Sequence, residues 1–293
     1  MKVDKKQLKI YKSKTLEEKI EMSKERIKIW YEYYDGNVFV AFSGGKDSRV
    51  LLHLIRSIYP EVKAMFLDTG LEWPEIRNFV KQFDNVDWIR PKMKFIDVIE
   101  KYGYPVVSKD VSQKLYEIRT THSEKLLNKR LYGDVNKNGK IPEKWKFLID
   151  APFKISHNCC NILKKNPSKK YERENKLYPY IGTMTDDSMT RISSYLRTGC
   201  NAFELNRPRS TPIAFWNEQN IWGYIKKFNL SYSSIYNTGL ERTGCMFCMF
   251  GCHMEKGKNN RFEIMKQLHP KQYDFCINKL GIANILKYIN KGK

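Results

Sequence analysis

The chain has 293 residues, 41% of them hydrophobic, and its 53 lysines and arginines exceed its 32 aspartates and glutamates to give a formal net charge of +21. This content supports a buried core and excludes wholesale disorder, and the length excludes three ordinary domains. The charge favours a polyanionic partner such as a nucleic acid, although lysines on solvated helix faces would give the same excess. No apolar run follows the charged N-terminus or is long enough to span a bilayer, so we expect a cytoplasmic protein with no membrane contact.

Helices and strands are predicted to alternate through the first third of the chain. Thr15-Leu-Glu-Glu18 has the form of a capping box that opens a helix. Short apolar runs are typical of buried strands, and apolar residues at helical spacing follow them. The predicted order is a helix to about Tyr34, a strand over 38–42, a helix after residue 48, a strand over 62–67, a helix from Pro74, a strand over 86–90 and a helix over 95–102. This order is typical of a Rossmann-like α/β fold, a parallel twisted sheet with helices on both faces that binds ligands beyond the carboxyl ends of its strands.

The rest of the sequence predicts how the chain is divided. We expect an N-terminal helix within residues 1–36 to pack on an α/β domain over 37–245, and residues 246–293 to form a cysteine-containing segment with a small helical cap. Residues 120–150 are basic and then rich in Asn and Gly, which predicts an insertion with turns. The remaining expected elements are a strand over 178–183 and helices over 186–196, 218–228 and 260–293.

Ser43-Gly44-Gly45-Lys46-Asp47-Ser48, the glycine loop, lies between a predicted strand and a predicted helix. Its glycines allow a tight turn close to a phosphate, and the start of the helix adds amide groups and a partial positive charge. Lys46 supplies charge, the serine hydroxyls can donate to phosphate oxygens, and Asp47 is suited to holding Mg²⁺. Because Asp rather than Ser or Thr follows Lys46, the loop is not a Walker A motif. We therefore predict a nucleotide site with Lys46 and Asp47 as catalytic residues; the alternative is a structural glycine turn.

The glycine loop resembles the pyrophosphatase motif of the adenine nucleotide alpha hydrolase (PP-loop) superfamily, whose members cleave ATP between its α and β phosphates. Segments 66–75 and 181–191 are similar to nucleotide-binding segments of its phosphoadenosine phosphosulfate (PAPS) reductase-like branch, with Met184 where that branch has an arginine. The resemblance covers nearly the whole chain and implies ATP or a related adenine nucleotide as ligand, with Mg²⁺ near Asp47 and Asp68. The nucleotide-binding residues that it implies are Ser43, Gly44, Gly45, Lys46, Asp47, Ser48, Asp68, Thr69, Gly70, Gly182 and Arg191.

Seven cysteines in a chain without a visible signal peptide argue against a disulfide framework. Cys159-Cys160 and Cys245-x-x-Cys248 resemble the tandem pair and distant CxxC with which adenylylsulfate reductases hold one 4Fe–4S cluster, which needs four thiolates. The resemblance implies that Cys159, Cys160, Cys245 and Cys248 are the metal ligands. The alternatives are Cys252 in place of Cys159 as fourth ligand, zinc held by Cys245, Cys248, Cys252 and either His253 or Cys160, a redox dithiol, and inert thiols.

The C-terminal sequence separates two activities. Sulfonucleotide reductases attack sulfur with a mobile cysteine in a Cys-Gly-x-His context, whereas this tail has only Cys276, followed by Ile-Asn-Lys. With the intact glycine loop, the chain therefore resembles the ATP-dependent iron–sulfur members that act in DNA phosphorothioation, or those that thiolate tRNA.

The resulting hypothesis is an enzyme that cleaves ATP to AMP and pyrophosphate and adenylates an acceptor in DNA or tRNA. Sulfur from a cysteine desulfurase or another donor then displaces AMP, with the cluster positioning or carrying that sulfur. One alternative is a thiol-dependent reductase of PAPS or adenylylsulfate. A second alternative is a nucleotide-sensing, nucleic-acid-binding subunit without turnover.

Overall fold

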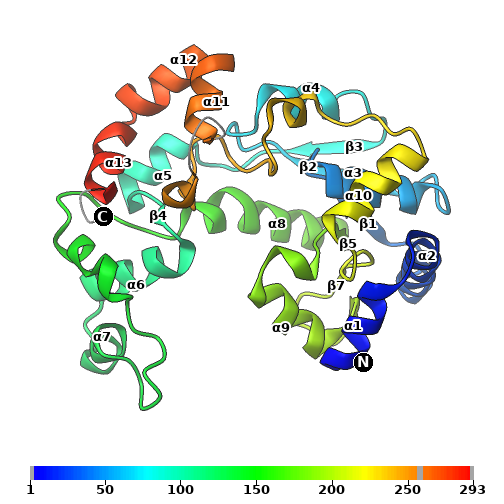
Figure 1. Ribbon diagram of the computed structural model, residues 1–293, viewed down its shortest axis with the longest axis horizontal. Coiled ribbons are helices and arrows are strands. Elements are labelled where there is room, and N and C mark those ends of the chain that lie inside the picture. The colour runs from blue at the N-terminus through cyan, green and yellow to red at the C-terminus, as the bar shows by residue number, and fades with distance from the viewer. Residues whose placement is uncertain (1–2, 256–259, 291–293) are drawn as a thin grey trace. The chain divides into compact units, whose positions relative to one another are not determined.

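The computed structural model describes residues 3–255 and 260–290, and the chain divides into two compact units (Figure 1). The first unit comprises Met1–Asp68, Pro74–Ile89 and Ser168–Tyr236, and the second comprises Thr69–Trp73, Arg90–Pro167 and Asn237–Lys293. Each unit therefore combines segments that are far apart in the sequence. The contiguous domain boundaries expected from the sequence stay a prediction.

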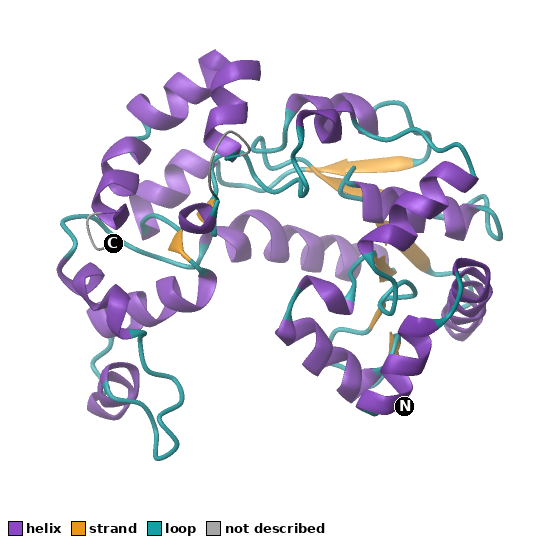
Figure 2. Cartoon of the chain, in the orientation of Figure 1, coloured by secondary structure: helices purple, strands orange, loops and turns teal. Residues whose placement is uncertain are grey.

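A six-stranded sheet forms the centre of the first unit, in the order β3-β2-β1-β5-β7-β6 (Figure 2). Its strands are β1 (Val38–Ala41), β2 (Lys63–Leu67), β3 (Val86–Ile89), β5 (Tyr178–Ile181), β6 (Asn201–Ala202) and β7 (Arg209–Ser210). Its helices are α1 (Lys5–Ser13), α2 (Leu16–Tyr33), α3 (Lys46–Arg56), α4 (Pro74–Val80), α8 (Asn166–Asn175, in this unit from Ser168), α9 (Met189–Thr198) and α10 (Glu218–Lys227), with 3₁₀ turns at Thr185–Asp187 and Ser234–Thr238. All paired strands are parallel except β6 and β7, which confirms the predicted parallel sheet.

Helices cover both faces of this sheet. Phe39 of β1 packs against Tyr171 of α8, with ring centroids 5.1 Å apart. Tyr180 of β5 is paired with Val40 and therefore points to the opposite face, because successive side chains of a strand alternate. There its hydroxyl donates a hydrogen bond to the carbonyl oxygen of Ile27 in α2 at 2.7 Å. Helices α2 and α8 thus lie on opposite faces, as the Rossmann-like prediction requires.

The second unit is mainly helical. Its helices are α5 (Phe95–Tyr102), α6 (Lys109–Thr120), α7 (Glu124–Leu131), α11 (Arg261–Leu268), α12 (Pro270–Asp274) and α13 (Ile282–Asn290), with 3₁₀ turns at Glu143–Asp150 and Cys252–Met254 and π-helical turns at Asn161–Lys165 and Phe275–Lys279. Two short strands, β4 (Val106–Val107) and β8 (Met249–Phe250), pair in parallel. The predicted helical C-terminal segment is confirmed over residues 260–290, and residues 291–293 lie outside the described part. Within the described ranges, no helix has the length and apolar composition that crossing a bilayer requires.

The capping box predicted at Thr15 sets the start of α2. The amide of Glu18 donates to Thr15 Oγ1 at 3.2 Å, and the amide of Thr15 donates to Glu18 Oε2 at 2.8 Å. Two amides that a helix start would otherwise leave without partners are satisfied in this way. The predicted helix to about Tyr34 is confirmed.

One predicted boundary is wrong, and several elements are missing from the sequence prediction. The helix expected from Asp186 begins at Met189. The carboxylate of Asp187 accepts a hydrogen bond from the amide of Met184 at 2.9 Å and closes a 3₁₀ turn before the helix. Helices α1, α6, α7 and α8 and strands β4, β6, β7 and β8 are not predicted; the four strands have only two residues each, and α8 has one buried residue among ten.

Thr15→Ala should lower the free energy of unfolding by about 1 kcal/mol, because the amide of Glu18 loses its acceptor at the start of α2. Thr15→Ser keeps a hydroxyl and serves as the matched control. Urea denaturation followed by circular dichroism measures the effect as a lower midpoint at an unchanged slope. Equal midpoints for the Ala variant and the wild type would contradict the capping role.

Candidate functional site

The glycine loop connects β1 to α3 in the first unit, and its own groups hold its shape. Gly44 has a φ of +74°, and a Cβ added there would lie 2.7 Å from Val80 and 2.8 Å from Ile76, both of α4. A side chain at this position is therefore excluded both by conformation and by space. The hydroxyl of Ser48 donates to the carbonyl oxygen of Gly45 at 2.9 Å, a bond within the loop. The expected bonds from the serine hydroxyls to phosphate stay a prediction.

Lys46, the first residue of α3, is only 5% exposed. Its ammonium nitrogen lies 3.3 Å from Glu218 Oε1, 3.7 Å from Asp47 Oδ1 and 5.3 Å from the centre of the Tyr236 ring. Its backbone amide donates to the Tyr236 hydroxyl at 2.9 Å. A buried ammonium needs nearby negative charge, which Glu218 and Asp47 provide. Sequence reasoning missed Glu218 and Tyr236 because they are distant from the loop and belong to no motif.

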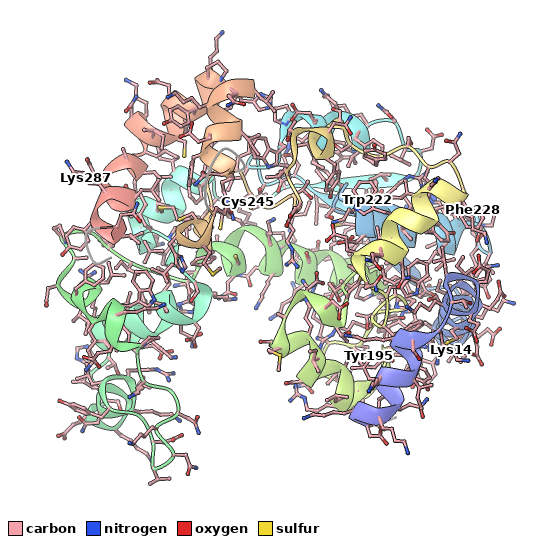
Figure 3. The ribbon with its side chains drawn as sticks, viewed as in Figure 1. Lys14, Tyr195, Trp222, Phe228, Cys245 and Lys287 are labelled. Atoms are coloured by element: carbon pink, nitrogen blue, oxygen red, sulfur yellow. The ribbon has the colours of Figure 1, made fainter. Side chains whose placement is uncertain are left out.

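Aromatic rings support the contact at Tyr236. Trp222 of α10, labelled in Figure 3, packs edge-on against Tyr236 with ring centroids 5.8 Å apart, and against Tyr232 at 5.2 Å. These rings hold a phenol hydroxyl against the first amide of α3. That amide is one of the groups with which the start of a helix binds phosphate.

Asp68 and Thr69 are adjacent in the sequence but belong to different units. Asp68 follows β2 in the first unit, is 3% exposed, and accepts a hydrogen bond from Arg77 at 3.0 Å. In the second unit, the Thr69 hydroxyl and amide donate to the two carboxylate oxygens of Glu72, each at 2.8 Å. Gly70 follows with a φ of +78°. The structure places Asp68 at the carboxyl edge of the sheet that carries the glycine loop, and the roles expected for Thr69 and Gly70 stay predictions.

Gly182 follows β5 and lies against the glycine loop. A Cβ added to it would lie 3.2 Å from both the carbonyl oxygen of Asp47 and the amide nitrogen of Ser48. The structure therefore brings together two segments that the sequence resemblance assigns to one nucleotide site. Arg191 lies in the first turn of α9 and forms an ion pair with Asp187.

The four cysteines expected as metal ligands, Cys159, Cys160, Cys245 and Cys248, all lie in the second unit, where Figure 3 labels Cys245. Burial raises the pKa of the Cys159 thiol, and the negative charges of the other three cysteines raise it further. Burial and the charge of Cys245 raise the pKa of Cys248 to about 12. Since such interactions weaken with distance, the four sulfurs share one neighbourhood. The cysteines of these two distant parts of the chain are thus near enough to act on one another's pKa, and their role as one ligand set stays a prediction.

The backbone forms a local turn beside each of the two cysteine pairs. Cys160 immediately precedes the π-helical turn Asn161–Lys165. At the CxxC, the amide of Cys248 donates to the carbonyl oxygen of Cys245 at 3.1 Å, and the amide of Met246 donates to that of Leu71 at 2.8 Å.

Lys164 accompanies the thiols. It donates a hydrogen bond to Cys245, and the charge of Cys245 is the largest cause that raises the pKa of the Lys164 ammonium. Burial raises the pKa of Cys245, whereas the charge of Lys164 opposes this rise. The Lys164 nitrogen also lies 3.8 Å from Glu72 Oε1. A cation at this place favours the thiolate form, which is the form that binds metals.

Cys252 is the alternative to Cys159 as the fourth predicted ligand, and the structure does not decide between them. It is 7% exposed, and its charge acts on the same Arg261 guanidinium as that of Cys248. Burial lowers the pKa of Arg261, but the hydrogen bond to Glu255 and the charges of Glu255 and both cysteines outweigh it. Arg261 also donates to the carbonyl oxygen of Cys248 at 3.0 Å. Cys252 therefore lies near the CxxC without being placed among the ligands.

Four thiols match the ligand number and type of a 4Fe–4S cluster, so the donor chemistry fits. Across residues 3–255 and 260–290, no three or more His, Cys, Asp or Glu side chains form a group that could hold a metal ion. A cavity of about 430 Å³ in the second unit reaches Cys245 and is lined also by Trp73, Arg242 and Arg261. The cluster and its ligands stay a proposal.

The first unit defines the class of the protein. A tight glycine turn leaves the carboxyl end of a central parallel strand and leads into a helix whose first residue is a buried lysine. Parallel α/β sheets bind nucleotides at this place, where helix amides meet phosphate. This is the architecture of an α/β nucleotide-binding domain.

The chain belongs to the phosphoadenosine phosphosulfate reductase domain family, which it matches over residues 37–95 and 106–250. This confirms the predicted family; the iron–sulfur DNA phosphorothioation type stays a prediction.

Two curated relatives and one solved structure illustrate the similarity. An uncharacterized protein of Methanocaldococcus jannaschii is 28% identical over 258 residues, which cover 87% of this chain but 43% of the relative, so the chain spans less than half of that protein. An adenosine 5'-phosphosulfate reductase of Bacillus mycoides is 26% identical over 218 residues, covering 74% of this chain and 75% of the relative. A phosphoadenylyl-sulfate reductase structure from Candida auris, in a phosphate complex, has a TM-score of 0.44 at 14% identity and covers 84% of this chain and 97% of its own.

Gly182→Ala should lower the free energy of unfolding by about 1–3 kcal/mol and weaken adenine nucleotide binding, because the added methyl group forces the backbone at Asp47 and Ser48 to move. Urea denaturation and calorimetric titration with ATP measure the two effects. Gly223→Ala is the matched control, since its Cβ would meet only Leu16 at 3.4 Å and alanine favours the interior of α10. Unchanged stability and ATP affinity in Gly182→Ala would contradict the close approach.

Cys160→Ser should lose most of the iron and sulfide that the wild type takes up on anaerobic reconstitution, because one of four thiolate ligands is removed. Cys276→Ser changes a buried thiol outside the ligand set and should retain both. Comparing Cys159→Ser with Cys252→Ser identifies the fourth ligand, and elemental analysis of zinc in the same samples tests the other metal. Full iron and sulfide content in Cys160→Ser would exclude the proposed set.

Proposed function

We propose that this chain binds ATP at the glycine loop, cleaves it to AMP and pyrophosphate, and thereby activates a nucleic acid for sulfur transfer assisted by an iron–sulfur cluster. The observation that carries the proposal is the buried Lys46 at the start of α3, in a loop that Gly182 approaches to within contact distance. These groups bring the ammonium of Lys46 and the first amides of α3 to the carboxyl edge of the sheet, where phosphate oxygens could replace Glu218 and Asp47 as partners of Lys46. A polyphosphate is the ligand that suits it.

The loop residues have distinct parts in this reaction. Lys46 and the amides at the start of α3 would bind phosphate oxygens and offset the charge that develops on the leaving pyrophosphate. Asp47, and with it Asp68, would hold Mg²⁺, which when bound neutralises further phosphate charge. The phenol hydroxyl of Tyr236 accepts from the Lys46 amide, so a phosphate that uses this amide has to replace it.

The chemistry proceeds in three displacements. An oxygen of the acceptor attacks the α phosphorus, and the bond between that phosphorus and the bridging oxygen of pyrophosphate breaks. The terminal sulfur of a persulfide, supplied by a cysteine desulfurase or another donor, then bonds to the acceptor atom that carries AMP as the bond to AMP breaks; a second thiol attacks the donor sulfur of the resulting S–S bond, so that the new sulfur stays on the acceptor and the two thiols leave as a disulfide. The net charge of +21 suits a DNA or tRNA acceptor.

The cysteines of the second unit would serve the sulfur step. Cys159, Cys160, Cys245 and Cys248 would hold a 4Fe–4S cluster, which when bound would position or carry the sulfur. Lys164 donates to Cys245 and offsets part of the negative charge that four thiolates accumulate. The cavity that reaches Cys245 gives a small sulfur species a route to this place.

A second candidate is a thiol-dependent reductase of a sulfonucleotide. It is favoured by the similarity to proteins named adenosine 5'-phosphosulfate reductase. Such a reaction needs an accessible thiolate, whereas Cys276 is fully buried and its pKa is raised to about 12 by that burial. The burial of Cys276 argues against it as the nucleophile and makes the ATP reaction the better proposal.

With α-labelled ATP and Mg²⁺, anaerobically purified protein should release AMP and pyrophosphate, and DNA or tRNA should increase the rate. Asp47→Ala should lower the rate by about 100-fold or more, because the metal-binding carboxylate is lost. Asp84→Ala removes an exposed carboxylate of the same unit and is the control.

Absence of ATP cleavage in protein that retains its iron and sulfide would overturn the proposed function. Release of sulfite from PAPS or adenylylsulfate by the same sample would then establish the reductase. Nucleotide and nucleic-acid binding with neither product would indicate the sensing subunit.

A further inference from the structure

A second cavity lies in the first unit, away from the glycine loop. It measures about 550 Å³, within the range of sites that bind small molecules or segments of larger ones. It is lined by one face of α8, by the first residues of β5 and by the turn that leads into β7. Because β1, β5 and β7 are parallel, the start of β5 and β7 lies at the edge of the sheet opposite to the glycine loop. This cavity is therefore no part of the nucleotide site.

Helix α8 presents a basic face to this cavity. Lys169, Glu172, Arg173 and Lys176 line it; the first three are three and four residues apart and lie on one side of the helix, and Lys176 follows its last residue. The opposite side carries the buried Tyr171, whose hydroxyl donates to Asp87 at 2.7 Å. The Tyr171 anchor fixes the helix on the sheet and leaves the basic face directed away from it.

The negative charge in the cavity is already neutralised. Glu172 accepts two hydrogen bonds from Arg207, one of them 2.6 Å long to the guanidinium Nε. Lys169, Arg173 and Lys176 are exposed and retain their net charge of three. Because Arg207 occupies both carboxylate oxygens of Glu172, this carboxylate does not neutralise the other cations of the cavity, and a local positive field remains.

The pKa of a neighbouring arginine and the backbone conformation of Lys176 are both consistent with a local positive field. Burial lowers the pKa of Arg209, in β7, and the charges of Arg207 and Arg197 lower it further, so the arginines here repel one another. Lys176 has a φ of +54°, a conformation that glycine or asparagine adopts at lower cost than lysine. A lysine therefore lines the cavity in a conformation that costs it more than glycine or asparagine.

We propose that this basic cavity binds the phosphodiester backbone of the nucleic acid acceptor. From Lys169 to Arg173 helix α8 rises by about 6 Å, and Lys176 follows directly after its last residue, whereas one strand of a nucleic acid presents a phosphate every 3.4 Å or so along its axis. The three cations therefore span more than one phosphate of a strand. A single phosphate group is too small to contact all of them. The acceptor's identity rests on the proposed function, but binding to this surface does not require ATP cleavage.

The test compares two variants with equal change of charge. Lys169→Glu with Arg173→Glu reverses two cations of the cavity, and Lys5→Glu with Lys9→Glu reverses two exposed cations at the same spacing on α1. Fluorescence anisotropy measures binding of a labelled 20-nucleotide single strand, its duplex and a tRNA over a series of salt concentrations. Lys169→Gln with Arg173→Gln removes the charges without introducing repulsion, and circular dichroism confirms that each variant is folded.

The cavity variants should weaken binding by about tenfold or more and reduce the salt slope by about 0.7 to 0.9 per lost contact, while the α1 variant changes little. Equal weakening in both pairs, or no oligonucleotide binding by the wild type, would overturn the proposal. Displacement of the oligonucleotide by millimolar inorganic phosphate alone would show a small-anion site and overturn it as well.

Basal ATP cleavage without nucleic acid separates this proposal from the proposed function. The cavity variants should keep that cleavage, because none of the changed residues belongs to the glycine loop. Wild-type protein that binds oligonucleotides through the cavity but never cleaves ATP would refute the proposed function and leave the surface intact.

Discussion

The withdrawal of the Lys46 ammonium from water organises the first unit. A lysine that is 5% exposed has to be placed beside negative charge, and the chain meets this requirement by bringing Glu218, from the start of α10, to 3.3 Å. Because Glu218 is itself more than half exposed, solvent screens the pair and its contribution to stability is modest. Its importance is positional, since it fixes where α10 begins relative to the glycine loop.

A similar arrangement recurs beside the cysteines. Lys164 lies 3.8 Å from Glu72, a carboxylate with little exposure that also receives the amide and hydroxyl of Thr69. Lys46 thus pairs with Glu218 beside the glycine loop, and Lys164 pairs with Glu72 beside the cysteines. In both cases the glutamate belongs to another segment of the chain than the lysine. The glutamate keeps the cation in place before an anionic ligand or a set of thiolates takes up the charge.

The sequence predicts what is encoded locally and little of what depends on distant contacts. Strands β1 to β3, helices α2 to α5, the glycine loop and the capping box at Thr15 follow from short patterns, and the structure confirms them, whereas α1 is missed. The gathering of the two cysteine pairs follows from a family resemblance, because nothing in their spacing alone would bring residues 160 and 245 together. Glu218, Tyr236 and Arg77 are missed since each reaches the site from an element of its own. Helix α8 is missed since Tyr171 is the one buried residue among its ten.

The pairing of β4 with β8 has a consequence for the order in which the protein is made. The two-residue strand at Val106 finds its partner only at Met249, and Cys159-Cys160 likewise finds the CxxC only after residue 248 has been synthesised. Contacts between such distant segments form slowly, because a long stretch of chain has to close first. During translation the tandem cysteines therefore leave the ribosome well before the thiols that accompany them. Until residue 248 emerges, these two residues depend on a reducing environment to remain thiols, so the cluster proposed above can be completed only after the CxxC has been synthesised.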